Sequence, residues 1–318
     1  MVAALAALVV AFPMVVKDPY VMHMLNMAGI YALLTLSLNI LAGFTGQVSL
    51  GHAAFYGIGA YTSAILSVDY HWSPWVGLAM AGVVAAAFGF LLGLPTLRLK
   101  GLYLAVATIG FGEIMYLVFV NWIPVTKGPM GITQVPQPAI LGIKLDSYNS
   151  YYYLVIAALV VALFLSYRLV NSRVGRALLA IRENETAAEA MGINSTYYKV
   201  LAFTLSAGLA GIAGGLYAHE IGFISPESFL NSESIAILTM MVAGGMGNIF
   251  GSVLGALVLV VVPEAMRAFG DIRLVIYGAA LILMMIFLPG GLAGWFQRLD
   301  EYLAARFSRG STPRTKEV

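Results

Sequence analysis

The chain has 318 residues, of which 60% are hydrophobic and 10% charged, with a formal net charge of +2 and no cysteine. Soluble domains carry about 25% charged residues, so this composition excludes an ordinary soluble domain. The absence of cysteine excludes disulfides and thiolate metal sites, and the four scattered histidines lack metal-ligand spacing, so no metal site is expected. Residues 19–68 contain no Asp, Glu, Lys or Arg, as expected of a chain that crosses a membrane several times.

Continuous apolar runs predict an all-α, polytopic integral membrane protein with about ten transmembrane helices. The run at 1–16 lacks the basic start of a cleaved signal peptide, so it is interpreted as a short first helix. The split between the eighth and ninth helices, at Gly247-Asn248, could instead lie inside one long helix over 233–262. The expected spans are 1–16, 21–42, 48–67, 75–95, 102–122, 151–168, 200–219, 233–248, 250–267 and 273–289.

Basic residues predict the orientation of a single membrane domain over residues 1–318. The predicted spans place twelve of the 17 Lys and Arg residues on one side and five on the other. The more basic side is cytoplasmic by the positive-inside rule. Both termini, the segment 169–199 and the tail 298–318 are therefore expected in the cytoplasm, and the loop 123–150 outside. Twelve basic residues are assigned inside: Arg98, Lys100, Arg168, Arg173, Arg176, Arg182, Lys199, Arg298, Arg306, Arg309, Arg314 and Lys316. Five are assigned outside: Lys17, Lys127, Lys144, Arg267 and Arg273.

Two features place polar groups within the apolar runs. Glycines and polar residues interrupt the runs between Gly43 and His52, which fits either a broken helix beside a substrate path or an interfacial turn. Glu113 lies inside the span 102–122, where a carboxylate is either functional or paired with a polar group such as Tyr103. The translocation path is assigned to Gln47, Ser49, His52 and Glu113, although His52 and His219 could each be a hydrogen-bonded core group. Pairs such as Gly211 and Gly215 predict close helix packing, either within this chain or against a partner subunit.

The internal segment 169–199 carries charges of both signs and is predicted to be helical. Val174, Leu178 and Ile181 share one helix face, Thr186-Ala-Ala-Glu189 fits a capping box, and Gly192 fits a helix stop. The segment is either a solvated linker helix or a docking helix. A docking helix would present small residues for close approach and carboxylates to basic partners.

Several stretches resemble the LivM-type inner-membrane permeases of branched-chain amino-acid ABC importers. They include LNILAGFTGQVSLGHAAFYGIGAYTSAIL at 38–66 and LRLKGLYLAVATIGFGEI at 97–114. They also include KGPMGI at 127–132, VAGGMGNIFGSVLGA at 242–256 and the long stretch VGRALLAIRENETAAEAMGINSTYYKVLAFTLSAGLAGIAGGLYA at 174–218. The resemblance implies that 175–192 is the coupling helix, although the family's Glu-Ala-Ala consensus is matched only loosely from Glu185 to Gly192. Coupling to the ATPase is assigned to Gly175, Arg176, Arg182, Glu183, Glu185, Ala187, Ala188, Glu189 and Gly192.

The same resemblance implies the partners and the activity. The chain would pair with a second, similar permease, two ABC ATPase subunits and an extracytoplasmic binding protein in the bacterial inner membrane, with no nucleic-acid partner. It would move leucine, isoleucine and valine, with urea or short amides as an alternative. No GxxxxGK[ST] phosphate loop occurs, so the chain is not expected to be an enzyme or to bind a cofactor, and the partner ATPases would use ATP and Mg²⁺. A stand-alone ion-coupled secondary transporter or channel is the alternative from another class.

Overall fold

The computed structural model describes residues 12–13, 18–96, 99, 101–140, 143–144, 147–267, 270, 272–288 and 290–295. The expected first span, apart from residues 12–13, and the expected tail at 298–318 lie outside these residues. So do eight of the basic residues used to predict the orientation: Lys17, Arg98, Lys100, Arg298, Arg306, Arg309, Arg314 and Lys316.

Helices dominate the described chain, as the apolar runs predict. In chain order they are α2 (Pro19–Leu38), the π-helix η1 (Asn39–Gly43), α3 (His52–Val68), α4 (Pro74–Thr96), α5 (Leu102–Asn121), α6 (Ile123–Thr126), η2 (Gly128–Met130), α7 (Tyr148–Val170), α8 (Arg173–Glu183), α9 (Glu185–Ala190), α10 (Ser195–Ile221), η3 (Pro226–Phe229), α11 (Asn231–Gly244), α12 (Ile249–Ala265) and α13 (Ile272–Phe287). Four two-residue strands form two antiparallel pairs: β1 (Ile132–Thr133) with β4 (Phe223–Ile224), and β2 (Ala139–Ile140) with β3 (Ile143–Lys144).

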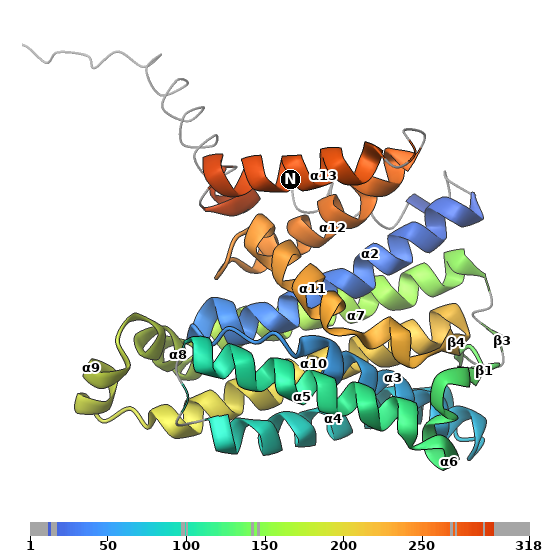
Figure 1. The fold of residues 1–318 in the computed structure, drawn as a ribbon, viewed down its shortest axis with the longest axis horizontal. Helices are drawn as coiled ribbons and strands as arrows, with labels where there is room; N and C mark the ends of the chain where they lie inside the picture. Colours follow the sequence, from blue (N-terminus) through green and yellow to red (C-terminus); the bar gives the residue numbers. More distant parts are fainter. Residues whose placement is uncertain are drawn as a thin grey trace, which may run out of the picture.

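Helix α10 lies at the centre of the bundle and packs against α2, α3, α4 and α7. Figure 1 shows α8 and α9 at one end of the bundle, and α6 with the short strands at the opposite end. These are called the α8–α9 end and the loop end below. Helix α13 packs against α11 and α12, on the far side of the bundle from α4 (Figure 1).

Close packing inside the chain explains much of the glycine pattern. A Cβ placed on Gly211 would lie 2.4 Å from the carbonyl oxygen of Ala81 in α4, and one on Gly214 would lie 2.0 Å from that of Tyr56 in α3. Glycine is thus the residue that lets these three helix backbones touch. The internal-packing interpretation of the repeated glycines is confirmed at Gly211.

The expected spans agree with the helices that the structure describes, but the count of ten is not confirmed. Five helices are long and apolar enough to cross a membrane: Pro19–Gly43, Pro74–Pro95, Leu102–Asn121, Tyr148–Val170 and Ser195–Ile221. Helices α3 and α13, with 17 and 16 residues, are shorter than these five helices.

Helices α11 and α12 are together long and apolar enough to form a sixth candidate, although they meet at a bend of 120°. Gly245 and Gly247 adopt positive φ at this bend, and Asn248 caps α12 by accepting a hydrogen bond from the Gly251 amide at 2.9 Å. The predicted break at Gly247-Asn248 is therefore real. It forms a broken span or a re-entrant pair, whereas the sequence predicted two full crossings.

Candidate transport path and coupling segment

Helix α3 begins beside the middle of α5. A Cβ on Gly51 would lie 2.1 Å from the carbonyl oxygen of Thr108, and one on Gly112 would lie 3.6 Å from the Cα of Gly51. The Leu50 amide donates to the Thr108 hydroxyl at 2.9 Å, so this irregular segment takes part of its hydrogen bonding from a neighbouring helix. This geometry fits the broken-helix interpretation of residues 43–52, because an interfacial turn would lie at a helix end.

Helix α11 begins at the same level. The Ser234 hydroxyl accepts a hydrogen bond from the Ala53 amide at 2.9 Å, and the Asn231 amide nitrogen donates to Glu113 Oε2 at 3.1 Å. Glu113 stands eleven residues after the start of α5 and eight before its end, near the middle of the helix. Two helix starts and one carboxylate therefore meet halfway along the bundle. Discontinuous helices of this kind form substrate sites in many transporters.

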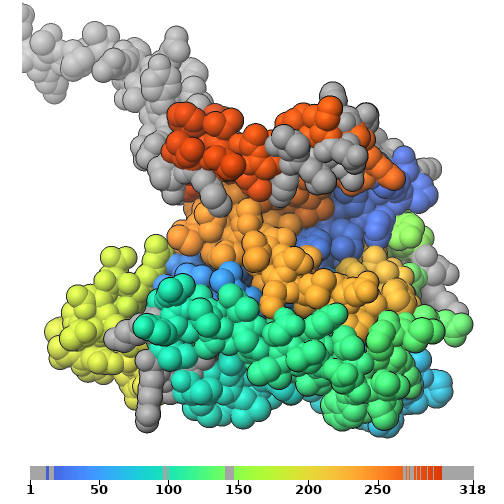
Figure 2. Space-filling view, viewed as in Figure 1, coloured from blue at the N-terminus to red at the C-terminus, as the bar shows by residue number. Residues whose placement is uncertain are grey.

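Glu113 lies on an exposed, mostly apolar face of α5 and α11. Its neighbours on this face include Ile109 and Leu117, one turn to either side on α5, and Ile235 on α11, all exposed. Figure 2 shows both helices on the same surface of the molecule. A carboxylate facing hydrocarbon at this depth would cost about 3 kcal/mol or more, so this surface, called the path face below, is suited to water or protein. Tyr103, considered as a partner from the sequence, is itself 77% exposed, and the partner that the structure gives Glu113 is Asn231.

The exposed face of α7 has a different chemistry. Its largest exposed side chains near mid-helix are Val160, Val161, Phe164 and Leu165, and residues 147–167 carry no formal charge. This is the surface that lipid tails require. The exposed surface of α7 thus suits lipid, whereas the path face, which carries a carboxylate, suits water or a protein partner.

His52 and His219, the two histidines considered above, lie inside the bundle and form hydrogen bonds there. The Ser37 hydroxyl donates to the Leu34 carbonyl, so His52 Nε2 must donate to Ser37 Oγ, 2.7 Å away. His219 Nδ1 donates to the Pro136 carbonyl at 2.6 Å, and Nε2 accepts from Ser63 at 2.8 Å. His219 is therefore a hydrogen-bonded core group. His52 is also in the core, although its Nδ1 and the nearby buried Ser49 hydroxyl have no protein partner among the described residues.

The coupling segment is two short helices, whereas the sequence predicted one. Helix α8 packs Leu178 and Ile181 inward, and the Ser172 side chain caps it by accepting from the amides of Val174 and Gly175. The capping prediction for α9 was wrong, because Asn184 and not Thr186 is the N-cap, accepting from the Ala187 amide at 3.0 Å. Asn184 also fits the cap pattern, and its extended backbone breaks the helix there.

The predicted stop at Gly192 is confirmed. Gly192 has φ of +84°, and the following Ile193 amide donates to the Ala188 carbonyl at 3.0 Å. This backbone hydrogen bond is that of a Schellman motif, which a glycine in the left-handed conformation permits at the end of a helix.

The residues assigned to coupling divide into two groups by position. Glu185 is half-buried, and six of them are exposed: Arg176, Arg182, Glu183, Ala187, Glu189 and Gly192. Gly175 and Ala188 are instead buried within the chain, and Glu189 accepts a hydrogen bond from the Ser195 hydroxyl. Met191, which the sequence analysis did not single out, is 84% exposed at the tip of α9.

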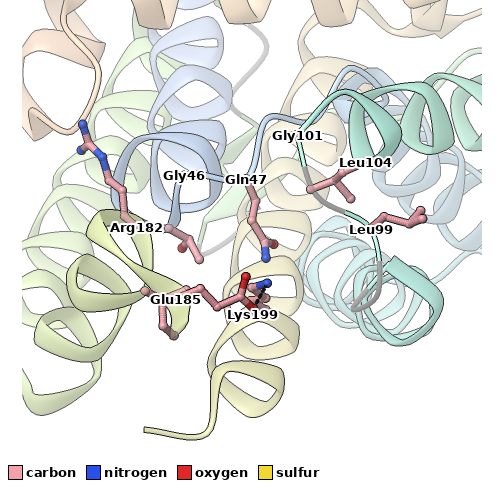
Figure 3. Close-up of a pocket in the computed structure, with 10 residues that line it drawn as sticks. Gly46, Gln47, Leu99, Gly101, Leu104, Arg182, Glu185 and Lys199 are labelled. Atoms are coloured by element: carbon pink, nitrogen blue, oxygen red, sulfur yellow. Dashed lines mark hydrogen bonds and ion pairs between the residues drawn. The ribbon is translucent and has the colours of Figure 1, made fainter. Parts of the chain in front are cut away.

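Arg182, Glu185 and Gln47 line a cavity of about 130 Å³ at the α8–α9 end. Glu185 forms an ion pair with Lys199, whose side chain is 7% exposed, and this pair holds α9 against α10. In Figure 3 Gln47 reaches toward this pair, whereas the Arg182 side chain points away from it. Gln47, assigned to the path, thus lies in the coupling region, apart from Glu113.

The sequence analysis missed three polar residues that join segments far apart in the chain. Glu220, the penultimate residue of α10, has a fully buried side chain that accepts a hydrogen bond from Asn26 Nδ2 at 2.9 Å, and His23 Nδ1 lies 3.3 Å from the same carboxylate. Asn39 and Asn231 each bridge segments far apart in the chain. Glu220 lay one residue beyond the predicted span 200–219, and single asparagines in apolar runs carry no pairing signal.

Comparison with known proteins gives consistent matches. The family model described as "Branched-chain amino acid transport system / permease component" matches residues 20–288. The chain belongs to this family. The match runs from the second residue of α2 to just past α13, so it includes both the path face and the α8–α9 unit.

Individual relatives agree with the family. The high-affinity branched-chain amino acid transport system permease protein LivM of Salmonella typhimurium is 42% identical over 91% of this chain and 73% of its own length. LivM of Escherichia coli K12 is 41% identical over the same shares. LivH of Escherichia coli K12, a permease of the same transport system, is 26% identical over 83% of this chain and 91% of its own length. No solved structure matches the chain.

Proposed function

We propose that the chain is the permease subunit of an ATP-driven importer that moves leucine, isoleucine and valine across the bacterial inner membrane. The family membership and the names of the relatives support the substrate class. The observation that carries the location of transport is the Glu113–Asn231 pair on the path face, where two helices start halfway along the bundle.

The path face is the proposed surface on which a second, similar permease completes the route. Free branched-chain amino acids carry an ammonium group, a carboxylate and an apolar side chain. Glu113 supplies a negative charge for the ammonium group, and Ile109 and Leu117 supply apolar surface for the side chain. His52 and Ser49 are buried at the start of α3, so they are proposed to hold this helix end in place behind the path face.

The α8–α9 unit is the proposed contact with one of two ABC ATPases, which would bind and hydrolyse ATP with Mg²⁺. It projects from one end of the bundle and exposes a small apolar tip of Ala187, Ala190 and Met191 (Figure 1). The distribution of the basic residues supports a cytoplasmic location for this end and for both termini. An extracytoplasmic binding protein would deliver substrate at the loop end.

Reconstitution tests this function. The chain, its companion permease, the two ATPases and the binding protein encoded with them are placed in vesicles, and uptake of labelled leucine is measured. ATP-dependent uptake that excess isoleucine or valine inhibits is expected. Uptake by the chain alone under a sodium or proton gradient would contradict the proposal, and inhibition by urea but not by valine would overturn the substrate class.

A further inference from the structure

Arg182 joins the α8–α9 unit to two membrane helices. It stands in the last turn of α8, and its Nη1 donates to the carbonyl oxygen of Gly43 at 2.5 Å. Gly43 is the last residue of the π-helix that extends α2. A Cβ placed on Gly247, in the bend between α11 and α12, would lie 2.7 Å from the same Nη1. One guanidinium thus touches the end of α2 and the α11–α12 bend together.

Asn39 fixes the same bend from the other side. Its Oδ1 accepts from the Gly247 amide at 2.8 Å, and its Nδ2 donates to the Asn248 carbonyl at 3.0 Å. A Cβ on Gly43 would lie 2.7 Å from the Gly247 nitrogen, so no side chain fits between the two segments. Residues Asn39, Gly43, Arg182, Gly247 and Asn248 are called the Arg182 junction below.

Helix α11 links this junction to the path face. The helix has 14 residues and is therefore about 21 Å long. Its far end carries Asn231 and Ser234, which contact Glu113 and the first turn of α3. Two hydrogen bonds from Asn39 hold the backbone of the bend, so a displacement of the junction would be passed to α11 as a rigid element.

We propose that Arg182 is a positioning residue that makes the α8–α9 unit and the α11–α12 bend move together. A displacement of α8 by the ATPases would then shift α11 and change the Glu113–Asn231 contact on the path face. This inference rests on the proposed function, because it needs a partner that moves α8.

The contact is specific to an arginine. Its planar fork carries several donors on a long side chain, so one nitrogen reaches Gly43 while the group fills the space beside Gly247. Lysine keeps the charge and one donor, and alanine removes both. Arg173, which is exposed at the start of the same helix, is the matched control.

The test compares Arg182→Ala, Arg182→Lys and Arg173→Ala in the reconstituted complex, measuring ATP hydrolysis and leucine uptake in the same vesicles. Arg182→Ala is expected to hydrolyse ATP like the parent but to take up about tenfold less leucine per ATP, since a charged hydrogen bond is lost. Arg182→Lys should recover part of this ratio, and Arg173→Ala should match the parent. A parental ratio in Arg182→Ala would overturn the proposal. A complex that no longer assembles would also overturn it, by assigning Arg182 to folding.

A distance measurement tests the joint movement directly. Spin labels are attached to Arg173→Cys on α8 and Met246→Cys in the bend, which is possible because the chain has no cysteine. Their separation should stay the same with and without ATP in the parent and change in Arg182→Ala. A separation that changes with ATP in the parent would refute the junction. Absence of ATP-driven leucine uptake in the parent complex would instead refute the proposed function.

Discussion

At the scale of single residues, the position of Glu113 is the most informative. Charge on a lipid-facing helix surface is unfavourable, yet this carboxylate is exposed and takes one hydrogen bond from Asn231. The pairing leaves Oε1 available on the path face. A carboxylate so placed can attract the ammonium group of a passing amino acid without holding it tightly.

Glu113→Gln is expected to lower the rate of leucine uptake at low concentration about tenfold, which corresponds to about 1.4 kcal/mol of lost attraction. The amide keeps the size of the side chain and an oxygen for Asn231, so the fold and the amount of subunit in the membrane should not change. Leucine binding by the isolated binding protein serves as the control. Uptake equal to that of the parent would remove Glu113 from the path.

The environment of the same position can be tested by labelling. In the assembled transporter, Glu113→Cys should react with a charged, membrane-impermeant thiol reagent, because the path face is expected to border water. Val160→Cys, which is 57% exposed near the middle of α7, should stay unlabelled in lipid. Equal protection of both positions would show that the path face borders lipid or a dry interface.

At the scale of elements, α9 has two distinct faces. Ala188 is 4% exposed and packs inside the chain, whereas Met191 is 84% exposed at the tip. A charge at Ala188 would therefore disturb this chain before it disturbed any partner. The docking hypothesis is better tested at Met191.

Met191→Asp should insert and melt like the parent but copurify with much less ATPase, because a buried unpaired charge at an interface costs several kcal/mol. Thr196→Asp, at an exposed position at the start of α10, controls for added charge near this end. Copurification of the ATPases at the parental level would favour the linker interpretation of α8 and α9.

The central helix packing gives a second element-scale prediction. Gly211→Ala should lower the stability of the subunit in detergent by about 1–3 kcal/mol, because its Cβ would lie 2.4 Å from both the Ala81 carbonyl and the Ala85 methyl group. Gly278→Ala, where no heavy atom lies within 4 Å, should melt at or slightly above the parental temperature. Thermal unfolding of the two variants decides this, and equal melting temperatures would contradict it.

At the scale of the whole molecule, the sequence predicted well what the membrane dictates. The expected spans 75–95 and 102–122 lie within two residues of the described bounds of α4 and α5, because lipid demands long uninterrupted apolar helices. The irregular stretch after Gly43 was also visible, since glycines and polar residues interrupt the run there.

The rest depended on contacts between distant parts of the chain. Asn231 and Glu113 are 118 residues apart, and Asn39 and Gly247 are 208 apart, so one sequence holds no sign that they meet. The predicted N-cap of α9 was wrong for a local reason. Asn184 and Thr186 are both good N-cap residues, and the extended backbone lies at Asn184, so the helix begins after it. The break between α11 and α12 was visible in the glycines at 244–247, but the 120° angle between the two helices was not, because both helices are apolar whether they cross the membrane once or twice.

The sidedness of the molecule remains a prediction from charge, and the two ends of the bundle offer matched probes for it. Met191 lies at the α8–α9 end and Met130 at the loop end, and their exposures are 84% and 83%. With the chain expressed without its ATPases, Met191→Cys should react with an impermeant thiol reagent only in inside-out vesicles, because the basic residues predict that this end is cytoplasmic. Met130→Cys should react only from the outside of intact cells whose outer barrier has been made permeable. The opposite pattern would invert the topology. Labelling of both positions from one side would contradict a bundle that spans the bilayer between them.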